Sequence, residues 1–125
     1  MAIPTDVRYT KSHEWARLDG NTVVVGISDH AQEQLGDVVH VDLPKLGRSL
    51  AAGATAAEIE SVKAVSDIYA PVSGTVVAVN DGLDDSPDLV NRDAYGEGWL
   101  FKLEVADASA LEGLLEAAAY AALVG

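Results

Sequence analysis

The sequence contains no cysteine, and it has only one methionine and one phenylalanine among 125 residues. The absence of cysteine excludes disulfide scaffolds, cysteine-ligated zinc and cysteine nucleophiles. Basic residues are also scarce, with 8 Lys and Arg against 20 Asp and Glu, which gives a formal net charge of -12. Because phosphate binding needs clustered Lys and Arg, we expect no nucleic-acid partner and no anionic membrane partner. Self-repulsion at this charge favours a monomer.

Long hydrophobic runs are missing as well. The longest apolar stretch, Ala117–Val124, is too short to span a bilayer. The N-terminus lacks the charged and apolar regions of a signal peptide, so we expect a cytoplasmic protein. The length predicts a single domain over residues 1–125, and 49% hydrophobic against 22% charged residues is typical of a globular chain.

Motifs of several common enzyme classes are absent. The three histidines, His13, His30 and His40, do not have the spacing of a helical zinc motif. No phosphate-binding G-K-[ST] motif occurs. The segment Gly96-Glu97-Gly98 begins like a dinucleotide-binding loop, but a strand pattern follows it instead of a helix. The sequence therefore predicts no catalytic residue and no metal site.

What the sequence does contain is a series of short strand patterns separated by turn residues. Val39, Val41 and Leu43 alternate with polar residues, which predicts that they share one buried face. Several short strands at close spacing are typical of a sandwich or a flattened barrel. The predicted strands cover residues 22–27, 39–43, 56–60, 65–70, 75–79 and 99–105.

Helical segments are few. Residues 28–35 begin with Ser28 as a candidate N-cap, and residues 86–88 mark one or two further helical turns. Ser109 and Glu112 have the spacing of a capping box, which predicts a C-terminal helix starting at Ser109. The apolar stripe of this helix, which we expect to pack on the sheet, consists of Leu111, Leu114, Leu115 and Ala118.

Residues 58–68 are nearly palindromic about the Lys63–Ala64 bond. This pattern predicts an antiparallel hairpin with a two-residue loop, in which Glu60 lies opposite Asp67. Lys-Ala is a poor two-residue loop, and like charges opposite one another are destabilising. Sequences tend to break local rules at functional sites. Lys63, one of only four lysines, is therefore either a solvated turn residue or an amine presented for acylation.

The segment Glu60–Asp67 resembles the lipoylation segment of the glycine cleavage H-protein family. The resemblance implies a mainly β fold, the barrel-sandwich hybrid of lipoyl domains, with short helices and a C-terminal α-helix. It covers nearly the whole chain, because further family motifs occur in the same order at Tyr9–Trp15, Gly26–Gln32, Leu35–Val39, Ala70–Gly74, Asp85–Pro87 and Tyr95–Leu100.

The resemblance implies a lipoyl carrier of the glycine cleavage system, with lipoic acid in amide linkage to Lys63 and no active site of its own. A pyridoxal-phosphate-dependent glycine decarboxylase would load the arm with an aminomethyl group. A tetrahydrofolate-dependent aminomethyltransferase would remove that group, and dihydrolipoyl dehydrogenase would reoxidise the dithiol. A lipoylating enzyme is the fourth implied partner.

A loaded arm would end in a cationic amine, which carboxylates and hydroxyls can bind. Ser12, Glu14 and Asp67 are the candidates for this docking, and the cleft in which the family parks its loaded arm supports them. Glu60 and Asp67 flank the lysine and are candidates for recognition by the lipoylating enzyme. We expect His13 and Trp15 on the opposite face of the strand that carries Glu14, with Trp15 in the core.

Three other readings use the same lysine. A lipoyl-relay protein would donate its lipoyl group to 2-oxoacid dehydrogenases. A biotin carrier domain usually has methionines beside its lysine, whereas Val62 and Ala64 stand here. An enzyme forming a Schiff base at Lys63 would need a depressed lysine pKa from burial or nearby cations, and an exposed acidic tip predicts the opposite surroundings.

Overall fold

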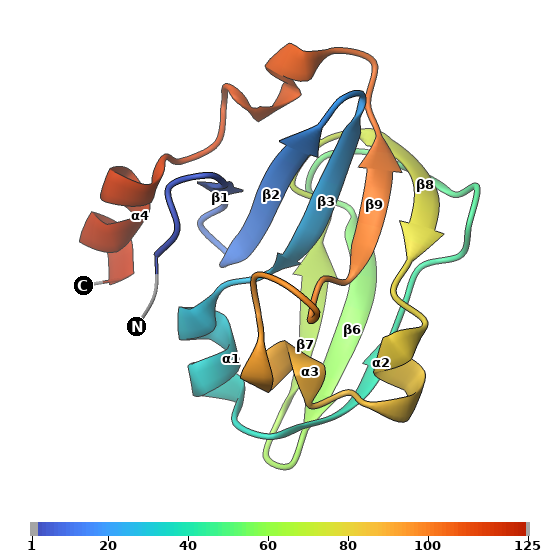
Figure 1. Cartoon of the computed structure of the whole chain (residues 1–125), viewed down its shortest axis with the longest axis vertical. Coiled ribbons are helices and arrows are strands. Elements are labelled where there is room, and N and C mark those ends of the chain that lie inside the picture. Colours follow the sequence, from blue (N-terminus) through green and yellow to red (C-terminus); the bar gives the residue numbers. More distant parts are fainter. Residues whose placement is uncertain (1–2, 125) are drawn as a thin grey trace.

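The computed structural model describes residues 3–124, which form two antiparallel sheets and several short helices (Figure 1). The strands are β1 Arg8–Tyr9, β2 Glu14–Asp19, β3 Thr22–Ile27, β4 Val38–Asp42, β5 Ser49–Leu50, β6 Thr55–Ser61, β7 Val65–Tyr69, β8 Gly74–Val79 and β9 Phe101–Glu104. The helices are α1 Asp29–Leu35, α2 Gly82–Asp85, α3 Leu89–Arg92, the 3-10 helix η1 Ala108–Leu111 and α4 Ala117–Val124. Within this span no helix has the length and apolar character needed to cross a membrane.

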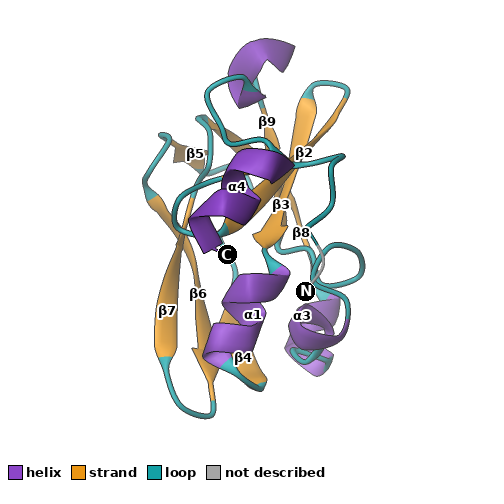
Figure 2. Cartoon of the chain, turned by 90° about the vertical axis from the view of Figure 1, so that its left-hand side faces the viewer, coloured by secondary structure: helices purple, strands orange, loops and turns teal. Residues whose placement is uncertain are grey.

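The two sheets pack over a shared apolar core. The larger sheet has the strand order β1-β2-β3-β9-β8-β5, and the smaller one has the order β4-β6-β7. Val25 and Leu103 from the larger sheet and Ile59 and Ile68 from the smaller one are buried in the same cluster. The mainly β fold with short helices and a C-terminal helix is therefore confirmed. The β6–β7 hairpin projects beyond the rest of the small sheet, beside α1 (Figure 2).

Strand β4 departs from the predicted alternation. Val41 is buried as expected, but Val39 is 48% exposed, and Val38 takes the buried position in its place. A bulge between Val38 and His40 accounts for the difference. Because a bulge inserts one extra residue into one strand, it turns the side chains before it to the other face.

The C-terminal helix forms, but the predicted start at Ser109 is wrong. The cap is Asp107, whose carboxylate accepts a hydrogen bond from the Ser109 backbone N–H, and it opens only the single 3-10 turn η1. Leu115 then exchanges two backbone hydrogen bonds of 2.8 Å with Tyr9, which extends the chain beside β1. This pairing with a distant strand delays α4 until Ala117.

A second apolar cluster lies between α4 and the larger sheet, and it contains Tyr9, Trp15, Val24 and Tyr120. Trp15 is fully buried, as predicted. Its indole N–H donates to the Ala94 carbonyl at 3.0 Å. Tyr95 and Trp99 pack against the same cluster, so the outer face around Trp15 is covered by the loop before β9 together with α4.

Candidate functional site

Lys63 lies at the tip of the β6–β7 hairpin and is exposed. The predicted register of this hairpin is wrong by two residues, since Glu60 pairs with Val65 and Asp67 pairs with Glu58. The loop consequently has four residues, Ser61 to Ala64, instead of two. A shift of two residues keeps every side chain on its predicted face, so the alternation of buried and exposed positions survives the error.

The Ser61 side chain explains the longer loop. Its hydroxyl oxygen accepts hydrogen bonds from the backbone N–H groups of Lys63 at 3.3 Å and Ala64 at 3.1 Å. The hydroxyl also donates to the Ala64 carbonyl at 3.2 Å. No residue of the loop has a positive φ. Lys-Ala is therefore acceptable here, because a side-chain cap closes the turn without the left-handed backbone that a two-residue loop requires.

The tip is held against the connection between α1 and β4. The Val62 N–H donates to the Asp37 carbonyl at 3.0 Å. The aliphatic part of Lys63 lies over Gly36, where an added Cβ would sit 3.3 Å from Lys63 Cε. In residues 3–124, no carboxylate comes within ion-pair distance of the Lys63 amine. The surroundings leave Lys63 exposed, so they do not supply the buried pocket that activates a Schiff-base lysine.

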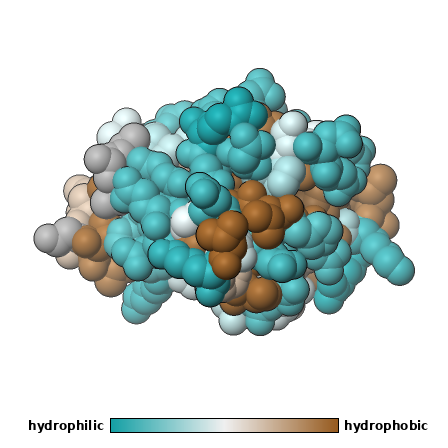
Figure 3. All heavy atoms as spheres, turned by 90° about the horizontal axis from the view of Figure 1, so that it is seen from below, coloured by the Kyte–Doolittle hydropathy of each residue, from teal (hydrophilic) through white to brown (hydrophobic). Residues whose placement is uncertain are grey.

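Exposed apolar side chains lie on the hairpin that carries the lysine and on the strand beside it. Val62 is 69% exposed and Val65 is 60% exposed, and the exposed Val39 belongs to the neighbouring strand β4. Seen from the end of the molecule where the hairpin lies, apolar surface is bordered by hydrophilic surface (Figure 3). Exposed apolar groups with a polar rim are typical of surfaces that bind other proteins.

Ser12 and Glu14 line a second feature, a hollow of about 340 Å³ beside the free edge of β7. Glu14 is only 1% exposed. Its Oε1 accepts hydrogen bonds from the hydroxyls of Thr10 and Ser12, and its Oε2 accepts one from the Tyr69 N–H at 3.3 Å. Across residues 3–124, no Lys or Arg pairs with this carboxylate.

A buried carboxylate without a cation is costly, because hydrogen bonds replace only part of its hydration. The hollow at Glu14 is therefore suited to a small cationic group. Thr10 and Tyr69, which complete the carboxylate's hydrogen bonds, were not anticipated from the sequence. Thr10 could have been found from its place in the β1–β2 hairpin, whereas nothing in the sequence relates Tyr69 to Glu14.

Similarity to known proteins agrees with these features. The sequence profile of a family described as glycine cleavage H-protein matches residues 7–125. The chain belongs to this family. H proteins are the lipoyl carriers of the glycine cleavage system. The main functional prediction is therefore confirmed at the level of the family.

Individual H proteins are similar over nearly the full length. One from Myxococcus xanthus is 54% identical over 122 residues, which cover 98% of this chain and 95% of the relative. One from Enterobacter sp. is 57% identical over 123 residues, which again cover 98% of this chain and 95% of the relative. The crystal structure of a glycine cleavage system H protein from Mycobacterium marinum superposes with a TM-score of 0.88 at 42% identity, covering 96% of this chain and 97% of that one.

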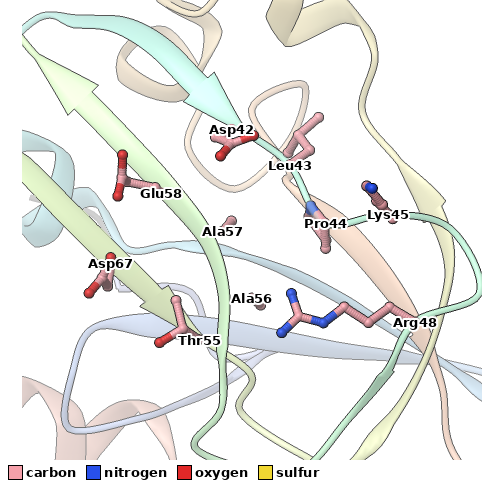
Figure 4. Close-up of a pocket in the computed structure, with 10 residues that line it drawn as sticks. All are labelled: Asp42, Leu43, Pro44, Lys45, Arg48, Thr55, Ala56, Ala57, Glu58 and Asp67. Carbon is pink, nitrogen blue, oxygen red and sulfur yellow. The ribbon is translucent and has the colours of Figure 1, made fainter.

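The structure does not bring the third predicted docking residue to the same hollow. Asp67 lines a different hollow, which has a volume of about 500 Å³ and lies on the outer face of the small sheet (Figure 4). There it lies opposite Glu58, which in turn lies opposite Asp42 on β4. Glu60, the other candidate for recognition by the lipoylating enzyme, is exposed and lies between His40 and Val65 on the neighbouring strands.

His13 is also placed differently from the prediction. It precedes β2 instead of continuing it, and its φ is +76°. Its ring lies 4.8 Å from that of His30, measured between centroids. In the part of the chain that the structure describes, no three His, Asp or Glu side chains form a group that could hold a metal ion.

Proposed function

We propose that this H-family protein carries lipoic acid in amide linkage to Lys63 and acts as one non-catalytic carrier domain. The observation that carries the proposal is the exposure of Lys63 on a hairpin tip whose backbone is closed by Ser61. When attached, the lipoyl group supplies a disulfide that accepts the aminomethyl carbon of glycine together with two electrons. The chain has no cysteine that could exchange with the resulting thiols.

The hollow at Glu14 supports a docking role for Ser12 and Glu14. Strand β7 runs from the hairpin tip to Tyr69, which lines this hollow. Its five residues span about 13 Å. That length is close to the roughly 14 Å of an extended lipoyl-lysine arm. We propose that Glu14 pairs with the cationic amine of the loaded arm and that Asp67, exposed midway along β7, acts on the approaching arm by charge alone.

The proposed partners are those that the resemblance implies. Glycine decarboxylase, the aminomethyltransferase and dihydrolipoyl dehydrogenase would each receive the arm in turn. The lipoylating enzyme would contact the apolar surface formed by Val39, Val62 and Val65. Glu60 and Asp67 lie beside that surface, and charges at the rim of an interface mainly affect association rates and the choice of partner.

Intact-mass measurement after incubation with lipoate, ATP and a lipoyl ligase tests the attachment. The wild-type chain should gain about 188 Da, one lipoyl group in amide linkage. Lys63→Ala should gain nothing, whereas Lys45→Ala, which removes another exposed lysine, should react fully. The double variant Val62→Lys/Lys63→Ala tests whether position matters, and we expect no modification. Absence of any gain in the folded wild-type chain would contradict the proposal.

A further inference from the structure

The loop that carries Ser12 and Glu14 contains an unusual backbone conformation. His13 is the one non-glycine residue with a positive φ in the described part of the chain. A side chain with a Cβ disfavours this left-handed region, which glycine adopts without strain. A strained residue persists only where the surrounding structure holds it. The contacts of His13 therefore indicate what holds this loop in place.

One contact is local, since the His13 N–H donates to the Thr10 carbonyl at 3.2 Å and closes a turn. The other contacts come from two distant segments. The His13 carbonyl accepts a hydrogen bond from the Ser28 N–H at 2.9 Å. The imidazole Nδ1 lies 2.7 Å from the Tyr120 hydroxyl, which also lies 2.6 Å from the Ser28 hydroxyl. Ser28 in turn caps α1 by accepting from the Ala31 N–H at 3.1 Å. A continuous hydrogen-bonded path thus joins α4, the start of α1 and the loop.

Tyr120 is rigidly held at its end of this path. It is fully buried, and its ring stacks on that of Tyr9 with centroids 4.3 Å apart and planes 3° from parallel. Tyr9 lies in β1, directly before the loop. Tyr120 of the C-terminal helix therefore contacts the loop through its hydroxyl group, and it contacts the preceding strand β1 through its ring.

We propose that Tyr120 is a positioning residue for the arm-docking hollow, acting through His13 on Ser12 and Glu14. The inference rests on the proposed function, in which these two residues bind the loaded arm. Ser12 and Glu14 flank His13 directly, so a rotation of the His13 backbone moves both. The 3.3 Å bond from the Tyr69 N–H to Glu14 is already near the limit of hydrogen bonding, so a small movement breaks it.

Two matched variants separate this role from general stability. Tyr120→Phe removes the hydroxyl that reaches His13 and keeps the stacked ring. Tyr9→Phe removes the other hydroxyl of the same stack, which donates to the Pro4 carbonyl at 2.6 Å instead of reaching the loop. In the unmodified protein, hydrogen exchange of the Tyr69 amide reports on Glu14. We expect Tyr120→Phe to accelerate it by about fivefold or more, and Tyr9→Phe to leave it near wild type.

The same variants, lipoylated and loaded with an aminomethyl group, test docking through the rate at which the group is lost to water. Glu14→Gln provides the rate without docking. We expect Tyr120→Phe to lose the group about fivefold faster than wild type, and Tyr9→Phe to behave as wild type. Equal rates in wild type and Glu14→Gln would refute the docking proposal itself. The docking proposal would stand, and the inference about Tyr120 alone would be overturned, if wild type loses the group more slowly than Glu14→Gln while Tyr120→Phe and Tyr9→Phe give the same result in both measurements.

His13→Gly provides a second route should Tyr120→Phe fold poorly. Glycine adopts the left-handed backbone without strain and has no side chain to contact Tyr120. We expect His13→Gly to behave as Tyr120→Phe in the exchange and release measurements. Wild-type behaviour in both would show that the contact positions nothing.

Discussion

The Lys63 side chain lies across Gly36, so that a Cβ added to Gly36 would come within 3.3 Å of Lys63 Cε. Gly36 ends α1 with φ +76° and ψ -157°. This combination is essentially restricted to glycine. One residue therefore terminates a helix and leaves space for the lysine stem, which links the geometry of the tip to that of α1.

Gly36→Ala should destabilise the protein, because alanine is strained in this conformation and its methyl group meets the lysine. We expect the free energy of unfolding in urea to fall by roughly 1–3 kcal/mol. Gly113→Ala is the control, since Gly113 has open space around it and no positive φ. Equal effects of the two substitutions would show that backbone conformation at Gly36 is unimportant.

Ser61→Ala removes the side-chain cap of the hairpin loop. The variant should lose about 1–3 kcal/mol, because the Lys63 and Ala64 N–H groups lose their acceptor, whereas the Ala64 carbonyl keeps the Ser61 N–H at 2.8 Å. We also expect slower lipoylation, measured by intact mass against time, because the loop no longer holds Lys63 in one conformation. Ser66→Ala, in the adjacent strand, has no hydrogen bond of this kind to lose. If lipoylation proceeds at the wild-type rate in Ser61→Ala, the cap is structural only.

Two substitutions of Glu14 should differ in stability. Glu14→Ala leaves the Thr10 and Ser12 hydroxyls and the Tyr69 N–H without their acceptor, and should cost about 1–3 kcal/mol. Glu14→Gln removes the buried charge, and its amide can still accept from Tyr69 while donating to the two hydroxyls. We expect its urea-unfolding free energy to equal or exceed that of wild type. A loss in Glu14→Gln as large as in Glu14→Ala would mean that the charge itself stabilises the fold.

The stability of the protein should depend on pH through His13. Burial, followed by the neighbouring His30, lowers the pKa of His13 below its ordinary value of 6.5. Between the lowered pKa and 6.5, the unfolded chain therefore binds more protons than the folded chain. The contribution of neutral His13 to stability is fully present above pH 6.5 and is lost as the pH falls through that window. Urea unfolding between pH 7.5 and 5 should show the decline, and His13→Asn should reduce it. An unchanged slope in the variant would assign the dependence elsewhere.

Several local features could be predicted because adjacent residues determine them. The β-branched run 22–27 forms β3, and Ser28 caps α1 through its own side chain, as its position before the helix indicates. The motif around Lys63 likewise identified the family without any coordinates. Patterns of this kind depend on backbone preference and on contacts within one or two turns of chain.

The hairpin register, the bulge in β4 and the start of α4 could not be predicted, because each depends on a competing contact. Ser61 caps the loop in place of a two-residue turn, and Leu115 pairs with Tyr9, 106 positions away, in place of continuing a helix. Intrinsic preference is weak enough for such contacts to override it.

The sequence by itself determined the strand-rich character, the family and the lysine that we propose to be modified. Only the tertiary structure decided that Glu14 is buried beside the amide of Tyr69, and that Tyr120 reaches the loop between Ser12 and Glu14. The reason is physical. Chain-local patterns specify which residue types alternate or cap, whereas the burial of a charge and the meeting of distant side chains arise only when the sheets and the C-terminal segment pack together.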